Sequence, residues 1–147
     1  MQHRFANPSL GLLALRIGVG SVMIYHGAQK LFGVFSGGGP AGTAQFFGSL
    51  GIPAPEIMAI VVGIVEFGGG LALMAGAMTH IAALLIAGTM LVAIVTVHLP
   101  QGFGGQGGYE FPLMLFLAAI GLFFLGPGHY SIDGVRHAGR EGEHVIP

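Results

Sequence analysis

Residues 81–95 read IAALLIAGTMLVAIV, and Thr89 carries the only polar side chain among them. A helix of a soluble bundle needs a polar face toward water, and this run offers none. Three more apolar runs share the chain, so that the candidate spans are Leu10–Phe32, Glu56–Met78, His80–Leu99 and Glu110–Gly126. Each has the roughly 17–25 residues that a helix needs to cross a bilayer. The sequence therefore predicts an all-α protein with four transmembrane helices.

The composition of the chain agrees with a membrane protein. Of its 147 residues, 53% are hydrophobic and 7% are charged, and the mean hydropathy is +0.81. Soluble globular domains carry about 25% charged residues. The formal net charge of −1 gives no electrostatic basis for nucleic-acid binding. The chain has no cysteine, which excludes disulfides and Cys-ligated metal centres, and it has no flavin or nicotinamide fingerprint.

The loops between the predicted spans indicate two tandem antiparallel hairpins. The second and third spans are joined almost directly through Thr79, which requires a tight turn. The two other loops are rich in glycine, and each follows a histidine and ends at a glutamate, as an internal duplication would produce. Within the first of them, residues 41–50 are predicted to form a short interfacial or re-entrant helix.

Lysine and arginine are distributed unevenly between the two ends of the predicted bundle. Arg4, Arg136 and Arg140 lie on the side of the termini, whereas loops 33–55 and 100–108 contain neither residue type. The positive-inside rule therefore predicts cytoplasmic termini and extracytoplasmic loops. We interpret the chain as a transmembrane domain, 1–134, followed by a polar cytoplasmic tail, 135–147.

Ionisable residues inside the predicted spans are the candidate functional residues. In hydrocarbon such a side chain costs several kcal/mol unless it is paired or hydrated, so it usually marks a working site. They are Arg16, His26 and Lys30 in the first span, Glu66 in the second, His98 at the end of the third, and Tyr109 and Glu110 at the start of the fourth. The three residues of the first span share one helix face. We expect a polar funnel that opens to the outside and ends on Glu66 and Arg16.

Pairing of Arg16 with Glu66 is the central prediction for this funnel. Arginine keeps its charge, so it would hold Glu66 ionised. Pairing would also lower the free-energy cost of placing each charge in hydrocarbon. Such a pair could equally be structural and lock the first two spans together.

The remaining polar residues leave several interpretations open. His26 and His98 could ligate haem or a metal, relay protons, hydrogen-bond a quinone carbonyl, or face the lipid headgroups. Their spacing matches no metal motif such as H-E-x-x-H. Lys30 could bind an anion or a quinone oxygen, or extend toward the interface. Tyr109 and Glu110 could exchange protons at the mouth, or simply begin a helix, where an acid favours the dipole.

An ordered series of short motifs runs through most of the chain. They are RIG at 16–18, HGAQKLFG at 26–33, GTA at 42–44, FF at 46–47, LGIPAP at 50–55, VEFGGG at 65–70, VHLP at 97–100, GYE at 108–110 and GPGHYSID at 126–133. Over residues 10–134 the chain thereby resembles the DoxX family of small bacterial membrane proteins. The resemblance implies a four-helix protein of the bacterial inner membrane and places the polar pattern of the family on Arg16, His26, Lys30, Glu66 and His98. Some members are linked to the oxidation of sulfur compounds with electrons passed to quinone, and others to quinone or oxidative-stress responses.

Together these observations favour a membrane subunit of a quinone-linked oxidoreductase, which would bind quinone or a small redox substrate in the polar funnel. The candidate catalytic residues are Glu66, His26 and His98, and the candidate binding residues are Arg16, His26, Lys30, Tyr109 and Glu110. Because the chain has no electron source of its own, its electrons would come from a protein partner, or from haem with His26 and His98 as ligands. The alternatives are a non-enzymatic assembly or anchor subunit and a haem-binding electron carrier. The chain could also form a homo-oligomer, and whether it is an enzyme by itself stays open.

Overall fold

The computed structural model describes residues 7–136, which form helices and contain no strand. The helices are α1 (Pro8–Phe32), α2 (Gly39–Ser49), α3 (Pro55–Ala75), α4 (Thr79–Ala93) and α5 (Glu110–Leu125). A π-helical turn, η1 (Ile94–His98), and a 3-10 turn, η2 (Leu99–Gln101), continue α4 toward the loop before α5. Most of the predicted tail 135–147 lies outside the described residues, as do Arg4 and Arg140, so the domain boundary stays a prediction.

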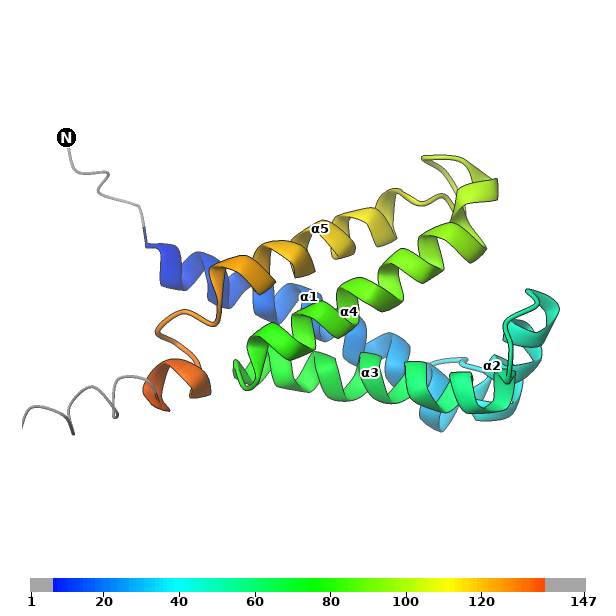
Figure 1. The fold of residues 1–147 in the computed structure, drawn as a ribbon, viewed down its shortest axis with the longest axis horizontal. Coiled ribbons are helices and arrows are strands. Elements are labelled where there is room, and N and C mark those ends of the chain that lie inside the picture. Colours follow the sequence, from blue (N-terminus) through cyan, green and yellow to red (C-terminus); the bar gives the residue numbers. More distant parts are fainter. Residues whose placement is uncertain (1–6, 137–147) are drawn as a thin grey trace, which may run out of the picture.

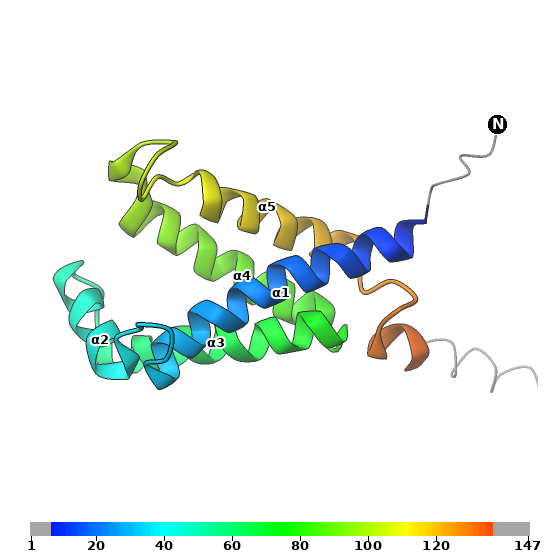
Figure 2. The ribbon, with the colours of Figure 1, turned by 180° about the vertical axis from the view of Figure 1, so that it is seen from behind.

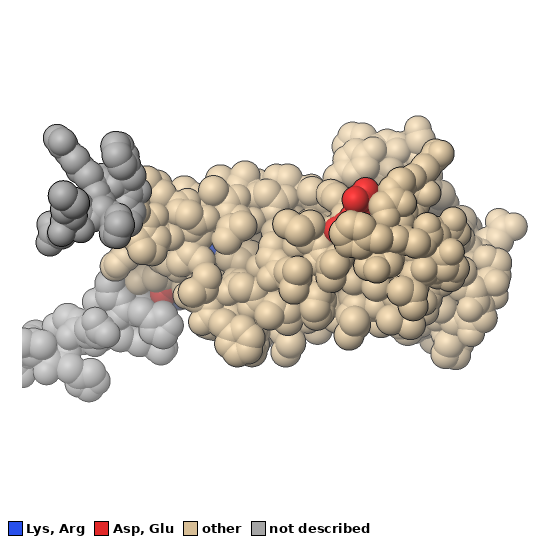
Figure 3. Space-filling view, turned by 90° about the horizontal axis from the view of Figure 1, so that it is seen from above, with Lys and Arg blue, Asp and Glu red and all other residues tan. Residues whose placement is uncertain are grey.

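Within residues 7–136, three helical stretches are long and apolar enough to cross a membrane. They are Pro8–Phe32, Pro55–Ala75 and Thr79–Gln101, whereas Glu110–Leu125 is a shorter apolar helix. The prediction of an all-α protein with long apolar helices is therefore confirmed for three of the four candidate spans. Many large apolar side chains on these helices are exposed, and one face of the molecule shows almost no charged atoms (Figure 3). Such a surface is suited to lipid rather than water.

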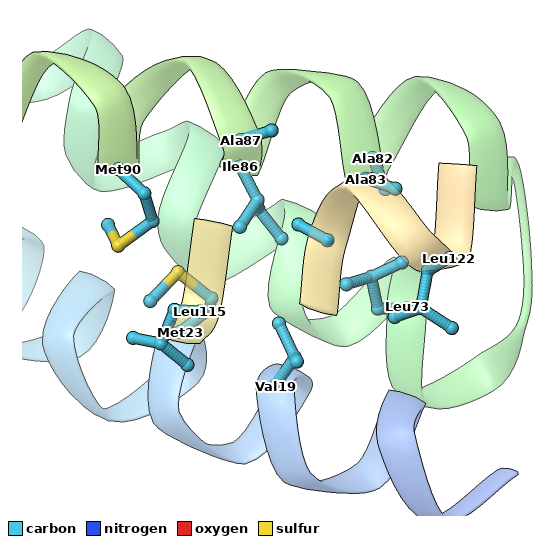
Figure 4. Packing of buried hydrophobic residues seen from close by; sticks show 11 residues of the cluster. Val19, Met23, Leu73, Ala82, Ala83, Ile86, Ala87, Met90, Leu115 and Leu122 are labelled. Carbon is cyan, nitrogen blue, oxygen red and sulfur yellow. The ribbon is translucent and has the colours of Figure 1, made fainter. Parts of the chain in front are cut away.

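The helices form two pairs that diverge toward one end of the molecule. Helix α1 packs mainly against α3, and α4 packs mainly against α5. The two pairs lie close together near the termini and separate toward α2 and the loop before α5 (Figures 1 and 2). A buried core joins the pairs where they meet, with side chains from α1, α3, α4 and α5 (Figure 4). Its larger members are Val19, Met23, Leu73, Ile86, Met90, Leu115 and Leu122.

Small residues set the register between α1 and α3. A Cβ atom on Gly27 would collide with the backbone of Phe67, and one on Gly70 would lie 2.8 Å from the carbonyl oxygen of Gly20. Glycine at these positions lets the two backbones approach closely, as is common between membrane helices. Gly63 in turn faces Leu31. Since Leu31 is almost the last residue of α1, helix α3 continues about 12 Å beyond it, and α2 packs on that extension.

The turn between α3 and α4 is closed by a residue from the far end of the chain. Gly76 and Met78 both have positive φ, at 67° and 50°, which ends α3 earlier than the predicted Met78. The Asp133 carboxylate accepts hydrogen bonds from the backbone N–H groups of Met78 and Thr79 and from the Thr79 hydroxyl, at 3.0–3.2 Å. Asp133 thereby caps the first turn of α4.

Candidate functional site

Five of the seven predicted site residues line one cavity of about 330 Å³. They are His26, Lys30, Glu66, His98 and Glu110, and they come from α1, α3, η1 and the first turn of α5. Glycines 105, 107 and 108 of the loop before α5 complete the polar part of the wall, so the cavity lies toward the divergent end of the helix pairs (Figure 1). Met23, Met90 and Leu115 form much of its apolar part. We refer to this space as the polar cavity.

An ion pair between α1 and α3 lies in the wall of the polar cavity. The Nζ atom of Lys30 is 2.6 Å from the Oε2 atom of Glu66, and the side chains are 22% and 5% exposed. Lys30 Nζ also lies 3.5 Å from the backbone carbonyl oxygen of His26, one helical turn earlier. Glu66 is therefore buried with a cation directly beside it, and the pair presents almost no net charge to the cavity.

The prediction that Arg16 pairs with Glu66 is wrong, because Lys30 occupies that place. The prediction assumed that the outer ends of the first two spans lie at one level, whereas α3 extends well beyond α1. In the observed register Arg16 lies beside Gly76, ten residues or about 15 Å along α3 from Glu66. Lys30 and Glu66 therefore line the polar cavity, and Arg16 does not.

Arg16 instead holds the segment that follows α5. Its Nη1 atom donates to the carbonyl oxygen of Pro127 at 2.6 Å, and its Nη2 atom donates to that of Tyr130. The side chain is 1% exposed. A guanidinium can satisfy several carbonyls at once, so this arginine joins α1 to the C-terminal segment.

Hydrogen bonds fix the ring tautomers of both histidines. His98 Nδ1 lies 2.8 Å from the Gly107 carbonyl oxygen, which can only accept, so Nδ1 carries the proton. His26 Nδ1 lies 3.1 Å from Gln29 Oε1, and Gln29 Nε2 donates to the Phe35 carbonyl, which identifies Oε1 as the acceptor. In the neutral rings, Nε2 is therefore the atom that can accept a proton or a hydrogen bond.

Sequence reasoning missed Gln29 and the unusual helical turn that carries His98. Gln29 lies three residues after His26 on the same helix face, which is a spacing that brings side chains together and could have drawn notice. Nothing in the sequence indicated the π-helical turn Ile94–His98, because its residues continue the apolar run of α4. Such turns inside helices frequently occur at functional sites.

Tyr109 and Glu110, at the start of α5, differ in their positions. Glu110 is in the first turn of α5 and lines the polar cavity. Tyr109 does not line it, and its ring packs edge to face against Phe103 at a centroid distance of 5.3 Å. The position of Tyr109 therefore does not support the predicted role of this residue in proton exchange at the mouth of the funnel. Over residues 7–136, no group of three or more His, Asp or Glu side chains could hold a metal ion.

Comparison with known proteins identifies the family of this chain. The DoxX family model matches residues 11–99, a range that includes four of the five polar residues of the cavity. The chain belongs to the DoxX family. The resemblance seen in the sequence motifs is thereby confirmed, and Glu110 lies beyond the matched range.

Curated relatives match nearly the full chain. The Bacillus subtilis protein named "Putative oxidoreductase CatD" is 35% identical over 92% of this chain and 94% of its own length. "Inner membrane protein YqjF" of Escherichia coli is 35% identical over 84% of this chain and 90% of its own length. "Uncharacterized membrane protein Rv3486" of Mycobacterium tuberculosis is 32% identical over 89% of this chain and 83% of its own length. No solved structure matches the chain significantly. This DoxX protein is accordingly a membrane protein.

Proposed function

We propose that this DoxX protein is a membrane subunit of a quinone-linked oxidoreductase and binds the quinone headgroup in the polar cavity. The observation that carries the proposal is the convergence of His26, Lys30, Glu66, His98 and Glu110 on one cavity inside apolar helices. Polar groups at membrane depth usually mark a substrate or proton path. The name of the Bacillus subtilis relative supports the oxidoreductase class.

The proposed membrane arrangement has four spans. Helices α1, α3 and α5 each cross the bilayer, as does α4 together with η1 and η2, in two antiparallel hairpins. Both termini are cytoplasmic, and the glycine-rich loops with α2 face the outside of the inner membrane. The name of the Escherichia coli relative, an inner membrane protein, supports the inner membrane as the location. In this arrangement the polar cavity exchanges protons with the outer side, because it is lined by the loop before α5.

Each polar residue has a definite task in this proposal. A quinone headgroup accepts hydrogen bonds at both carbonyl oxygens, and it takes up one proton for each electron when it is reduced to the quinol. Lys30 donates to one carbonyl oxygen, and a protonated His26 or His98 donates from Nε2 to the other. When the Lys30 ammonium gives a proton to the reduced headgroup, the Glu66 carboxylate takes up a proton from the outer side and passes it to Lys30. A protein partner supplies or accepts the electrons. Glu110 links the cavity to water.

Binding of menadione, a quinone without an isoprenoid chain, to the protein purified in mild detergent tests the proposal. Glu66→Gln should weaken menadione binding at least about tenfold, since it leaves the Lys30 ammonium without its partner. Glu56→Gln is the matched control, because Glu56 is exposed in the first turn of α3 and does not line the polar cavity. Absence of menadione binding by the wild-type protein would overturn the proposal. Unchanged binding by Glu66→Gln would remove Glu66 from the site.

Haem binding is the second candidate function, and the two histidines favour it. His26 and His98 line the same cavity, and because their Nδ1 atoms are hydrogen-bonded, the Nε2 atoms of these two rings would be the groups that hold a haem iron. Bound haem would supply one-electron transfer. An oxidised-minus-reduced absorption spectrum decides between the two candidates, because haem gives intense visible bands and a quinone absorbs in the ultraviolet. A spectrum without either signal, together with absent menadione binding, would favour an assembly subunit.

A further inference from the structure

A second cavity, of about 590 Å³, lies between α2, α3 and α4 on the other side of the Lys30–Glu66 pair. Its wall is built mainly from apolar side chains, among them Phe46, Phe47, Val61, Val65, Leu85 and Val92. We refer to it as the apolar cavity. Both cavities have volumes within the roughly 300–1,000 Å³ that is usual for ligand-binding pockets.

Four residues line both cavities, namely Lys30, Glu66, Ala93 and His98. The ion pair and His98 therefore stand at a junction, with polar groups on the α5 side and apolar groups on the α2 side. An occupant that fills both spaces must have a compact polar end and a long apolar end.

Away from the junction, the threonine hydroxyls along the apolar cavity have no free donor for a ligand. The Thr89 hydroxyl donates to the Ile86 carbonyl oxygen at 2.9 Å, and the Thr96 hydroxyl donates to that of Val92 at 2.8 Å. Both donors are thus used within their own helix. Among residues 7–136, Lys30 and Glu66 are the only charged groups that line the apolar cavity, and they neutralise each other.

The apolar cavity is placed to receive a chain from the bilayer. Val61, Leu85 and Val92 in its wall are 44%, 48% and 55% exposed, and they belong to α3 and α4, which diverge toward α2 (Figure 1). The net-neutral junction offers an anionic phospholipid headgroup no uncompensated cation. A neutral headgroup with hydrogen-bonding oxygens suits the junction better.

We propose that the apolar cavity holds the isoprenoid chain of a lipid quinone, which enters between α3 and α4 and places its headgroup in the polar cavity. This inference rests on the proposed quinone function and adds the substrate class, a membrane-resident quinone rather than a small soluble one. It also assigns a specificity role to α2 and to the outer part of α4, whose side chains contact the chain and not the headgroup.

Gly88 allows the apolar cavity to be filled without disturbing the helices. It is exposed on α4 and lies beside the cavity, and a Cβ atom there would meet no other atom within 4 Å. Gly88→Leu should weaken the binding of a menaquinone that carries an isoprenoid chain about tenfold, as expected from overpacking a binding space. Binding of menadione should be unchanged. Gly68→Leu is the matched control, because Gly68 is an exposed helical glycine with equally open surroundings that lines neither cavity.

Four other outcomes would each overturn this inference. Equal menaquinone affinity of Gly88→Leu and the wild-type protein would show that the chain lies elsewhere, while the proposed headgroup site would stand. An equal loss of menadione binding would mean that Gly88→Leu blocks the headgroup site instead. Loss of a co-purified phospholipid from Gly88→Leu, with menaquinone affinity unchanged, would identify the occupant as a lipid acyl chain. If the wild-type protein binds neither quinone, the proposed function fails as well.

Discussion

The Lys30 ammonium lies 2.6 Å from the Glu66 carboxylate and joins helix α1 to helix α3 at the boundary between the polar and apolar cavities. The Glu66 side chain is buried, at 5% exposed, and the Lys30 side chain is partly buried, at 22% exposed. Removing one partner from a buried pair leaves an uncompensated charge, whereas removing both leaves none. The pair therefore affects folding and binding in different ways, which variants can separate.

Lys30→Met should destabilise the protein by about 3–5 kcal/mol, because Glu66 then loses its counter-charge and must become protonated or stay buried as an anion. The double variant Lys30→Met/Glu66→Gln should recover much of this loss, although neither variant should bind menadione well. Unfolding in mixed micelles with increasing denaturing detergent measures the difference. A double variant that is less stable than Lys30→Met would show that the pair does not act as a unit.

Arg16 should matter for stability and not for the site. Arg16→Met leaves the carbonyl oxygens of Pro127 and Tyr130 without their donor, which should cost about 2–4 kcal/mol. Menadione affinity of the folded protein should be unchanged, because Arg16 does not line the polar cavity. The segment after α5 should also be cut faster by proteases. A loss of menadione binding without a loss of stability would return Arg16 to the site.

The extent of the helices followed from the sequence, whereas their relative heights did not. Apolar runs predict helices because a span must satisfy its own backbone groups, and α1 begins two residues before the predicted Leu10 and ends at the predicted Phe32. The partner of Glu66 depends instead on the stagger of α1 against α3. Close approaches such as that of Gly27 to the Phe67 backbone set this stagger, and composition alone does not reveal which glycines meet.

The gathering of site residues was predictable for a related reason. Buried charge in an apolar chain has few stable places, so residues of this kind tend to meet in one polar space. Five of the seven predicted residues do so. Arg16 does not follow this pattern, because its two terminal nitrogens donate to backbone carbonyls after α5, which carry no signature in the sequence. Tyr109 does not line the polar cavity, because its ring packs against Phe103 of the preceding loop.

Asp133 should make the stability of the protein depend on acid pH. Burial raises the pKa of Asp133, but hydrogen bonds from Thr79 and Met78 and the charge of Arg136 outweigh it, so the pKa lies below its ordinary value of 3.8. A carboxyl group with a lowered pKa stabilises the folded state above its unfolded pKa, and this contribution is lost as the pH falls through the folded pKa. The contribution of Asp133 should thus be complete at neutral pH and decline below roughly pH 5.

The difference in unfolding free energy between the wild-type protein and Asp133→Asn isolates this effect from the titration of other groups. Asparagine keeps the shape of the side chain but lacks the charge that strengthens the cap of α4. The difference should be largest near neutral pH and shrink toward acid pH. A difference that stays constant across this range would mean that the charge of Asp133 contributes nothing to the cap.

Gln29 should control the tautomer of His26. Its Oε1 atom accepts from His26 Nδ1, and its Nε2 atom is fixed by the Phe35 carbonyl oxygen. Gln29→Met removes the acceptor, so the ring should populate both tautomers, which nitrogen-15 chemical shifts of the histidine distinguish. Menadione affinity should fall about three- to tenfold, the effect of losing one hydrogen bond that orients a binding group. Gln45→Met is the control, because Gln45 is exposed on α2 and lines neither cavity. A changed affinity with unchanged nitrogen shifts would mean that Gln29 acts on the ligand directly rather than through His26.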